Sequence, residues 1–405
     1  MTDNQERDYV RELARQVARI AASPENELVK KRWRDVNALR KPDRAPVWCR
    51  PAGLWADLLP QEALTCADEW LRAFEYNFRM ILIKHDIGDD SPVEANFSVG
   101  AVFEWDPPNV WGVEMGRHEA NVPGGAWKYD PPLKTEADFD KLRIPISTYN
   151  EAKTQEALSR NHDLLGDIMP IKLTCGPSLG NNLCSAAVAL RGLEEIMTDM
   201  AAEPELVHRL MAHLQKGVLE NMPRLEQTGL LSPNNRGPMH CSDPIGPQSA
   251  DGKLTFKNLW GGADTQEFDL VSPAMWKEFL LDYQMPILEQ FGLTSYGCCD
   301  DLTHKMDGVL TIPNLRIFVS SAWTNLDKAI ERCGDRYTIM WRQKATDVVF
   351  PDDVEPIKRH LETGARKLQG NYYQIVLREL QTLAGHPDRL HVWTRMAIEA
   401  AERFA

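Results

Sequence analysis

Short apolar runs alternate with longer amphipathic segments from about residue 168 to the C-terminus, and this alternation constrains the fold more than any other feature of the sequence. The runs are rich in β-branched and aromatic residues, as strands are, and the segments between them carry apolar residues at helical spacing. The predicted strands contain the sequences IMPIKLT, FKNLWGGADT, LTSYGCC, LRIFVSS, YTIMWRQK and YYQIVLREL. Strands separated by helices of this length pair in parallel through right-handed crossovers. The sequence therefore predicts the α/β class.

The first half of the chain completes the count of strand–helix units. A first strand is predicted in APVWCRP, residues 45–51, and residues 86–131 are rich in Gly, Pro and Trp, as an insertion with long loops would be. About eight units result, which favours a (β/α)₈ TIM barrel over an open sheet. Neither GxGxxG nor GxxxxGK[ST] follows a predicted strand, so the usual signatures of a nucleotide-binding sheet are missing. We expect residues 1–44 to form an N-terminal helical extension and residues 45–405 to form the barrel.

Charge and composition exclude several classes of function. The formal net charge is −13, and no cluster of basic residues alternates with aromatic ones, so we expect no nucleic-acid partner. No run approaches the roughly 20 apolar residues of a membrane helix, and the N-terminus MTDNQERDYV lacks the apolar core of a secretion signal. These features predict a cytoplasmic protein. The eight cysteines include no CxxC pair, which argues against a disulfide framework and a zinc knuckle.

In a parallel barrel the functional groups gather where strands end and loops begin. The residues at predicted strand ends are Arg50, Ser98, Gly176, Pro177, the segment around His240, Asp264 to Asp269, Tyr296 to Asp301, Trp323, Lys344 and Glu379. We expect the side chains of Arg50, Cys298, Trp323 and Glu379 to converge at one rim.

Four segments, in the same order along the chain, resemble the uroporphyrinogen decarboxylase superfamily. They are PVWCRPAGLW (46–55), CGPSLG (175–180), FDLVSPAMWKEF (268–279) and WTNLDKAIERCGDRY (323–337). The resemblance implies a (β/α)₈ barrel, in agreement with the count of units. Two positions depart from the decarboxylases, where an Arg of the first loop holds substrate propionates and an Asp stabilises the pyrrole charge: Leu54 and Val99 stand there. Each lost partner is worth about 1.5–3 kcal/mol, so porphyrinogen decarboxylation is not expected.

The other branch of this superfamily contains corrinoid-linked methyltransferases. Their zinc site uses a His-x-Cys strand end and a later Cys, and this chain has YGCC, Tyr296 to Cys299, at the first place and Glu379 at the second. The YGCC strand end and the C-terminal segment LRELQTLAGHPDRLHVW resemble the first-step methyltransferases of anaerobic O-demethylase systems. The resemblance implies transfer of a methyl group from a small methoxylated aromatic to a Co(I) corrinoid. No His has an Asp two residues before it, as the corrinoid-binding DxHxxG motif requires, so the corrinoid should arrive on a separate protein.

Three catalytic residues and three metal ligands are predicted at the rim. Leaving phenolate must be stabilised by a proton donor or a Lewis acid, for which we expect Tyr296, Asp300 and Glu379. If zinc binds, the expected ligands are His240, Cys298 and Glu379, with His304 as the alternative histidine. Strand alternation would place Cys298 on the same face as Tyr296. The competing interpretations are cysteines as small core residues, exposed loop histidines, and an ion pair of Glu379 with Arg378 or Arg50.

The abundant tryptophans, twelve in all, suggest an aromatic-lined substrate pocket. The substrate-binding residues we expect are Arg50, Trp105, Trp260, Trp323 and Trp341. For any one tryptophan, packing in the core is the competing interpretation, and such a pocket would also suit a quaternary amine.

Two rival functions stay open at this stage. One is zinc-dependent methyl transfer from a methyl-corrinoid to a thiol such as coenzyme M, and the other is a tetrapyrrole-binding or decarboxylating relative. A corrinoid protein is the expected partner, and a homodimer is the expected assembly.

Overall fold

A parallel six-stranded sheet is the centre of the fold in the computed structural model, which describes residues 2–118, 128–247 and 249–405. Its strands lie in the order β1, β12, β11, β10, β9, β8. Their bounds are β1 (Val47–Cys49), β8 (Trp260–Ala263), β9 (Leu293–Tyr296), β10 (Leu315–Ser320), β11 (Thr338–Gln343) and β12 (Tyr372–Leu377). The α/β class is confirmed, and five of these strands lie in runs predicted from the repeating second half of the sequence.

A separate parallel pair, β2 (Phe97–Gly100) with β7 (Ile171–Thr174), supplies two further strands. Hydrogen bonds outside the ladders join this part of the chain to both ends of the main sheet. Toward β1, the Asp90 N–H donates to the Val47 carbonyl at 2.8 Å, and an Asp90 carboxylate oxygen accepts from the Val47 N–H at 2.8 Å. Toward β8, the Ser232 N–H donates to the Cys175 carbonyl at 2.9 Å, and the Asn234 side chain bonds both main-chain groups of Trp260 at 2.8 Å. The parallel ladder is thus continuous over the six strands of the main sheet. It is interrupted between β1 and β2 and between β7 and β8.

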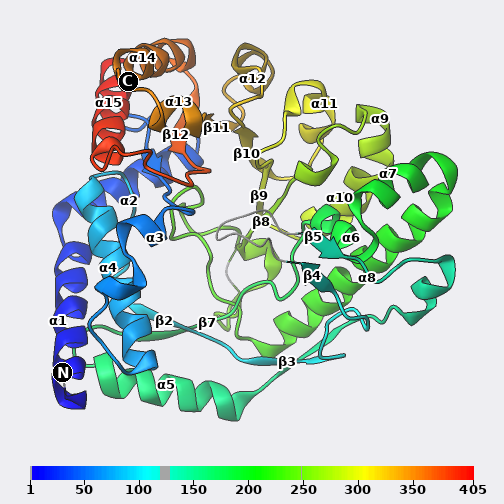
Figure 1. Ribbon diagram of the computed structural model, residues 1–405, viewed down its shortest axis with the longest axis horizontal. Coiled ribbons are helices and arrows are strands. Elements are labelled where there is room, and N and C mark those ends of the chain that lie inside the picture. The colour runs from blue at the N-terminus through cyan, green and yellow to red at the C-terminus, as the bar shows by residue number, and fades with distance from the viewer. Residues whose placement is uncertain (1, 119–127, 248) are drawn as a thin grey trace.

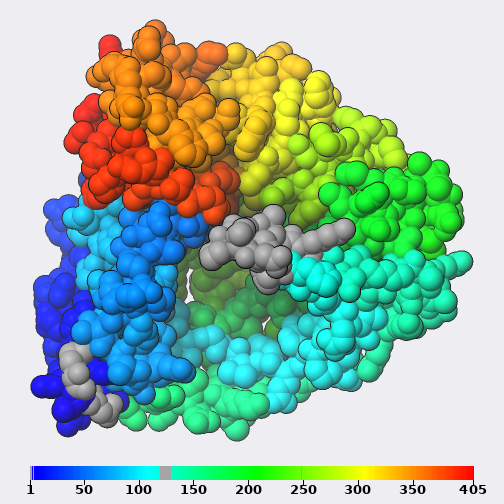
Figure 2. Space-filling model, viewed as in Figure 1, coloured from blue at the N-terminus to red at the C-terminus, as the bar shows by residue number. Residues whose placement is uncertain are grey.

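The predicted insertion contains small antiparallel pairs. These are β3 (Phe103–Asp106) with β6 (Ile146–Tyr149), and β4 (Gly116–His118) with β5 (Lys128–Asp130). β3 lies along the lower edge of the view in Figure 1, away from the strands of the main sheet, and this part of the chain is cyan at the same edge in Figure 2.

Helices surround the strands, as Figure 1 shows, and α15 near the C-terminus packs beside β1. The helices are α1 (Asp3–Ala21), α2 (Pro24–Asn37), α3 (Trp55–Leu58), α4 (Glu69–Ile87), α5 (Glu151–Leu165), α6 (Leu183–Arg191), α7 (Leu193–Ala202), α8 (Pro204–Thr228), α9 (Pro273–Trp276), α10 (Asp282–Leu288), α11 (Met306–Val309), α12 (Leu326–Cys333), α13 (Ala345–Val349), α14 (Glu355–Leu368) and α15 (Arg389–Arg403). A π-helical turn, Lys277–Leu281, joins α9 to α10. Within the described residues, no helix combines the length and apolar character needed to cross a membrane.

Two layers of buried apolar residues flank the main sheet. The smaller layer contains Trp260, Ile317, Val319, Met340 and Val376, which alternate along their strands with residues of the larger layer beneath the helices. The N-terminal helices add separate clusters: α1 packs against α4, and Trp33 and Val36 of α2 pack against Cys241. Because all six strands are parallel, their C-terminal ends share one edge, where the candidate site lies.

Candidate functional site

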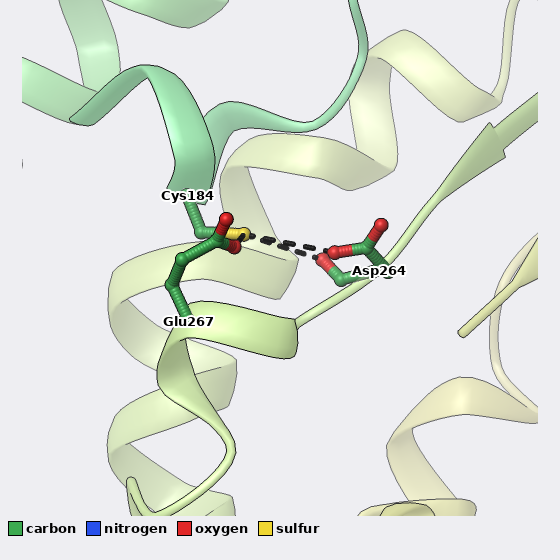
Figure 3. A group of neighbouring side chains, drawn as sticks. All are labelled: Cys184, Asp264 and Glu267. Carbon is green, nitrogen blue, oxygen red and sulfur yellow. Dashed lines mark hydrogen bonds between the residues drawn. The ribbon is translucent and has the colours of Figure 1, made fainter. Parts of the chain in front are cut away.

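A thiol and two carboxylates meet beyond the C-terminal end of β8, and we call Cys184, Asp264 and Glu267 the acid cluster (Figure 3). Asp264 directly follows β8, Glu267 lies in the 3₁₀ turn Gln266–Phe268, and Cys184 is in the first turn of α6. The Cys184 Sγ is 2.9 Å from Glu267 Oε2 and 3.9 Å from Asp264 Oδ1. One ligand atom from each residue lies within 4.8 Å of the others, so a single ion could contact all three.

Neutral groups provide the hydrogen bonds of this cluster. The Asn182 side-chain amide donates to Asp264 Oδ2 at 2.8 Å, and the Ser185 hydroxyl donates to Glu267 Oε1 at 2.5 Å. Within the described part of the chain, neither carboxylate has an ion pair with lysine, arginine or histidine. The acid cluster therefore holds negative charge without a cationic side chain to balance it.

Burial and mutual repulsion change the protonation of these groups. Burial, followed by the negative charges of Cys298, Asp300 and Glu267, raises the pKa of Asp264 to about 7. Burial and the neighbouring Glu267 raise the pKa of the Cys184 thiol well above its usual value. A bound divalent cation would relieve this repulsion, and a sulfur with two carboxylate oxygens is a donor set that zinc accepts. The residues of the acid cluster thus fit a zinc ion.

A cavity of about 1080 Å³ opens next to the acid cluster. Ser185 and Glu267 line it on one side, and Pro131, Val188 and Met197 contribute apolar wall. Glu267 is therefore part of the acid cluster and also part of the wall of a cavity large enough for a small ligand.

A second group, which we call the thiol cluster, consists of Cys298, Cys299, Arg342, Arg378 and Glu379. The two sulfur atoms are 3.7 Å apart, and Cys299 Sγ is 3.4 Å from Glu379 Oε1. The Nη1 group of Arg342 donates to the Cys298 carbonyl at 2.6 Å and to Glu379 Oε1 at 3.2 Å. Arg378 Nε lies 3.6 Å from the same carboxylate oxygen.

The two adjacent thiols of this cluster have opposite pKa shifts. The hydrogen bond from Cys299, against a smaller effect of burial and aided by the charges of Arg342 and Arg378, lowers the pKa of Cys298 to about 6. The ionised Cys298 and burial raise the pKa of Cys299. Cys298 is therefore a thiolate at neutral pH, and Cys299 remains a thiol that donates to it.

Asp300 connects the two clusters. One of its carboxylate oxygens accepts from the Thr265 N–H at 3.1 Å, next to Asp264, and the other accepts from the Cys298 N–H at 2.6 Å. The side chain is 1% exposed, and burial raises its pKa. Asp300, predicted as a catalytic residue, thus joins the ends of β8 and β9 through main-chain contacts.

Tyr296 does not share a face with Cys298, and this expectation was wrong. Its side chain is fully buried between sheet and helices, where its hydroxyl donates to Gln284 Oε1 at 2.9 Å and accepts from the Trp276 indole at 3.2 Å. Strand β9 ends at Tyr296, and Gly297 has a φ of +112°, so strand alternation stops before Cys298. Gln284 in turn donates to the Asp264 carbonyl at 3.0 Å. Tyr296 is thus connected to the acid cluster through Gln284, on the side where the helices pack.

Glu379 lies outside the strand in which the sequence places it. Strand β12 ends at Leu377, and Glu379 adopts a left-handed φ of +59° in the loop that follows. This conformation turns the carboxylate toward Cys299 and Arg342 instead of into an apolar layer. The ion pair with Arg378 that the sequence offered as an alternative is present, together with the unpredicted one to Arg342.

The structure does not bring the predicted metal ligands together. His240 stacks on Trp260 with ring centroids 4.8 Å apart, and its Nε2 lies 3.1 Å from Ser295 Oγ. Burial lowers the pKa of His240 to about 4, so the ring is neutral at physiological pH. His304 is exposed. Among the described residues, the acid cluster is the group whose ligand atoms converge, and it contains none of His240, Cys298 and Glu379.

The predicted aromatic residues do not form one pocket. Trp260 and Trp341 are 2% and 4% exposed, and Trp341 packs against His360 of α14. Trp105 lines a different cavity of about 550 Å³ with Pro177 and Ser232. Trp323 is 55% exposed at the end of β10.

Arg50 lies at the same strand edge as the thiol cluster, where its N–H donates to the Leu377 carbonyl at 2.8 Å. Its guanidinium carbon is 5.7 Å from the centre of the Trp48 ring.

The sequence does not predict two residues of the site, Cys184 and Arg342. Cys184 lies on a helix, away from any strand end, and nothing in its neighbourhood marks it as a ligand. Arg342 is a charged residue inside the apolar run TIMWRQ, and a charge buried in such a strand requires a partner. This signal could have identified it. Asp264 and Glu267 lie within the segment Asp264 to Asp269, which the sequence predicts at a strand end.

Comparisons with known proteins address the fold. No protein-family model and no curated protein sequence matches this chain. Solved structures with a similar fold include a methyltransferase from Methanosarcina mazei, which superposes with a TM-score of 0.51 over 93% of this chain and 98% of that chain, at 12% sequence identity. The chain therefore shares its overall fold with a methyltransferase.

Proposed function

We propose that this chain is a methyltransferase that moves the methyl group of a methoxylated aromatic compound to the Co(I) corrinoid of a separate protein. The corrinoid is a substrate carried by that partner, because this sequence has no Asp-x-His-x-x-Gly motif. The finer fold assignment belongs to the same proposal: we interpret β2 and β7 as the second and third strands of a (β/α)₈ barrel whose remaining strands form the main sheet. The fold shared with a methyltransferase supports both statements.

The buried position of Asp264 at the end of β8, beside other acidic groups that raise its pKa, is the observation that carries the proposal. Cobalt(I) supplies the nucleophile for the methyl carbon, so the protein must stabilise the phenolate that leaves. A carboxyl group with a pKa of about 7 is still partly protonated at neutral pH and can donate that proton. Glu267 extends the same acidic group to the wall of the cavity of about 1080 Å³.

Zinc bound at the acid cluster would keep Asp264 ionised, and its Lewis acidity toward the leaving oxygen would then take the place of the Asp264 proton. Cys184, Asp264 and Glu267 are the residues that would hold it. Zinc content after dialysis, measured with the wild type and Cys184→Ser, tests this point without any turnover. We expect the variant to lose the metal while a matched variant of the buried Cys333, Cys333→Ser, keeps it.

The activity is tested with a corrinoid protein reduced to Co(I), a methoxylated phenol, and the absorbance of methyl-Co(III). We expect transfer with the wild type and a rate at least about 100-fold lower with Asp264→Asn, the lower end of the effect of removing a general acid. Asp251→Asn, an exposed carboxylate, serves as the control. No transfer from any methyl donor, with a partner shown to be competent, would overturn the proposal.

The rival functions give different results in the same assay. Transfer from a betaine but from no aryl ether would replace the substrate. Methylation of coenzyme M from methyl-Co(III), without reaction of aryl ethers, would favour the zinc-dependent thiol methyltransferase. Turnover of a porphyrinogen would favour the decarboxylase; the positions at which decarboxylases carry Arg and Asp hold the buried side chains of Leu54 and Val99.

A further inference from the structure

The cysteines of this chain are of two kinds, which differ in their exposure. Six of the eight are buried, whereas the adjacent Cys298 and Cys299 are partly exposed beyond the end of β9. Burial raises the pKa of the Cys49 and Cys333 thiols to about 12, so that neither is a thiolate at neutral pH. The thiols that a reagent in solution can reach are therefore those of one adjacent pair.

The two thiols of this pair are close enough to react with one another after a small movement. Their Sγ atoms are 3.7 Å apart, against about 2.0 Å in a disulfide. Asp300 accepts from the Cys298 N–H at 2.6 Å and Arg342 donates to the Cys298 carbonyl at 2.6 Å, so hydrogen bonds hold the main chain on both sides of this residue. Rotation of the two side chains, with an adjustment of the peptide unit between them, would bring the sulfur atoms together.

Positive charge beside the pair favours a reactive thiolate. Arg342 Nη1 lies 4.0 Å from Cys298 Sγ and 3.8 Å from Cys299 Sγ, and Arg378 adds a second positive charge. The thiolate is the form of cysteine that attacks an electrophile. A partly exposed thiolate with a second thiol in reach is the arrangement typical of redox-sensitive cysteines. The proposed methyl transfer uses neither sulfur atom, so this arrangement has no role in it.

We infer that Cys298 and Cys299 are a peroxide-sensitive pair, in which Cys298 is oxidised first and Cys299 then closes a reversible disulfide between adjacent residues. The Cys298 thiolate attacks the terminal oxygen of a hydroperoxide, the O–O bond breaks, and the other oxygen leaves with a proton from solvent as water or an alcohol. The Cys299 sulfur then attacks the Cys298 sulfenic acid, the S–O bond breaks, and water leaves with the Cys299 proton. The two sulfur atoms together lose two electrons, which the peroxide gains. This inference goes beyond the proposed function and does not depend on it.

The short chain between the two sulfur atoms makes such a disulfide easy to reduce. Adjacent Cα atoms are about 3.8 Å apart across a trans peptide bond, whereas most disulfides join Cα atoms about 4.4–6.8 Å apart. Disulfides that depart from the usual geometry store strain and are reduced more readily. Closing the bond also removes the thiolate charge beside Arg342 and Arg378. The pair therefore fits a reversible modification better than a permanent cross-link.

The modification is tested on the reduced full-length chain, with hydrogen peroxide as the probe and mass spectrometry as the measurement. The tryptic peptide of residues 278–305 contains both thiols and no other cysteine. After peroxide, and then iodoacetamide under denaturing conditions, we expect this peptide to lack two hydrogen atoms and to carry no alkyl group, and dithiothreitol to restore both alkylation sites. The peptides of the six buried cysteines should be alkylated throughout. Sulfinic acid on Cys298 beside a free Cys299, or oxidation of Cys49 and Cys333 at the same rate, would overturn the inference.

Variants then assign the two roles within the pair. Cys299→Ser removes the second thiol, so dimedone should trap a sulfenic acid on Cys298 in this variant and much less of it in the wild type. Cys298→Ser removes the attacking thiolate and should slow the oxidation of the same peptide about tenfold or more. Cys333→Ser changes a buried cysteine and should keep both the rate and the disulfide of the wild type. An unchanged rate in Cys298→Ser, or equal dimedone trapping in Cys299→Ser and the wild type, would contradict the inference.

Discussion

Cys298 and Asp264 are acids that respond in opposite ways to one shared environment. Arginine charges and a thiol donor favour the ionised form of Cys298, whereas burial and nearby negative groups favour the protonated form of Asp264. The Cys298 thiolate is itself among the charges that raise the pKa of Asp264. Ionisation of the thiol thus helps to keep a proton on the carboxyl group.

The thiolate character of Cys298 predicts unusual reactivity. At pH 7 most of Cys298 is ionised, against a few per cent of an ordinary thiol, so iodoacetamide should modify it about tenfold faster or more. The rate should fall as the pH is lowered, with a midpoint near pH 6. Mass spectrometry of the modified peptide measures this rate. Cys298→Ser should abolish the fast phase, and a fast phase with a midpoint near 9 would contradict the prediction.

The raised pKa of Asp264 predicts a pH dependence of stability in metal-free protein. A carboxyl group that is protonated more readily in the folded state stabilises that state at low pH, and this contribution is lost as pH rises through the folded pKa of about 7. Asp264→Asn should therefore flatten the decline in unfolding free energy between about pH 4 and pH 7, the interval between the unfolded and folded pKa values. Urea titrations in the presence of a chelator measure it. If the slope is the same in the variant, the carboxyl group titrates normally.

At the scale of elements, the end of β9 decides where the thiols point. Gly297 adopts a φ of +112°, and a Cβ there would lie 2.9 Å from Leu302 Cδ1 and 3.0 Å from Val319 Cβ. The turn needs both the left-handed conformation and the absence of a side chain. In the same way, the left-handed Glu379 ends β12 and directs its carboxylate to Cys299. Periodicity predicted these strands but could not predict the backbone turns that end them.

Gly297→Ala should destabilise the protein by about 2–4 kcal/mol, which combines backbone strain with a steric clash. Gly370→Ala is the matched control, because Gly370 has a φ of +90° and nothing within 4 Å of the added Cβ. Its cost should be limited to about 1–2 kcal/mol of backbone strain. Thermal unfolding measures both, and equal costs for the two variants would show that the contacts of Gly297 relax freely.

For the whole molecule, Asp90 joins the N-terminal helices to the sheet. Its carboxylate contacts Arg32 of α2 at 2.5 Å and Arg44 at 2.6 Å, and all three side chains are at most 9% exposed. It also accepts the Val47 N–H beside the interruption between β1 and β2. Removing one partner from such a buried group leaves charges without compensation.

Asp90→Asn should therefore destabilise the protein by about 3 kcal/mol or more. Asp243→Asn breaks an exposed ion pair with Arg40 and should cost at most about 1 kcal/mol. Urea denaturation compares the two variants. A cost below 1 kcal/mol for Asp90→Asn would mean that Asp43, the second partner of Arg32, compensates for the loss.

The sequence predicted the order of strands and helices well, because each apolar run carries its own signal. It predicted much less of the site. Cys184 lies on α6 and Arg342 lies near the end of β11, and they join Asp264 and Glu379 only through the tertiary fold. The abundance of tryptophan predicts a pocket that includes Trp260 and Trp341, yet alternation within β8 and β11 directs both side chains into the apolar layers. Local patterns identify elements, whereas the convergence of side chains depends on how distant elements pack.

The pairing of β1 with β12 also has a consequence during synthesis on the ribosome. The first strand of the main sheet has its ladder partner near the end of the chain, so a nascent polypeptide must keep the β1 edge unpaired until residue 377 has emerged. Contacts this distant in sequence form late and expose a strand edge to other chains meanwhile. Arg378 and Glu379 follow that strand directly, so a chain that ends before residue 372 has both an unpaired β1 edge and a thiol cluster that lacks Arg378 and Glu379.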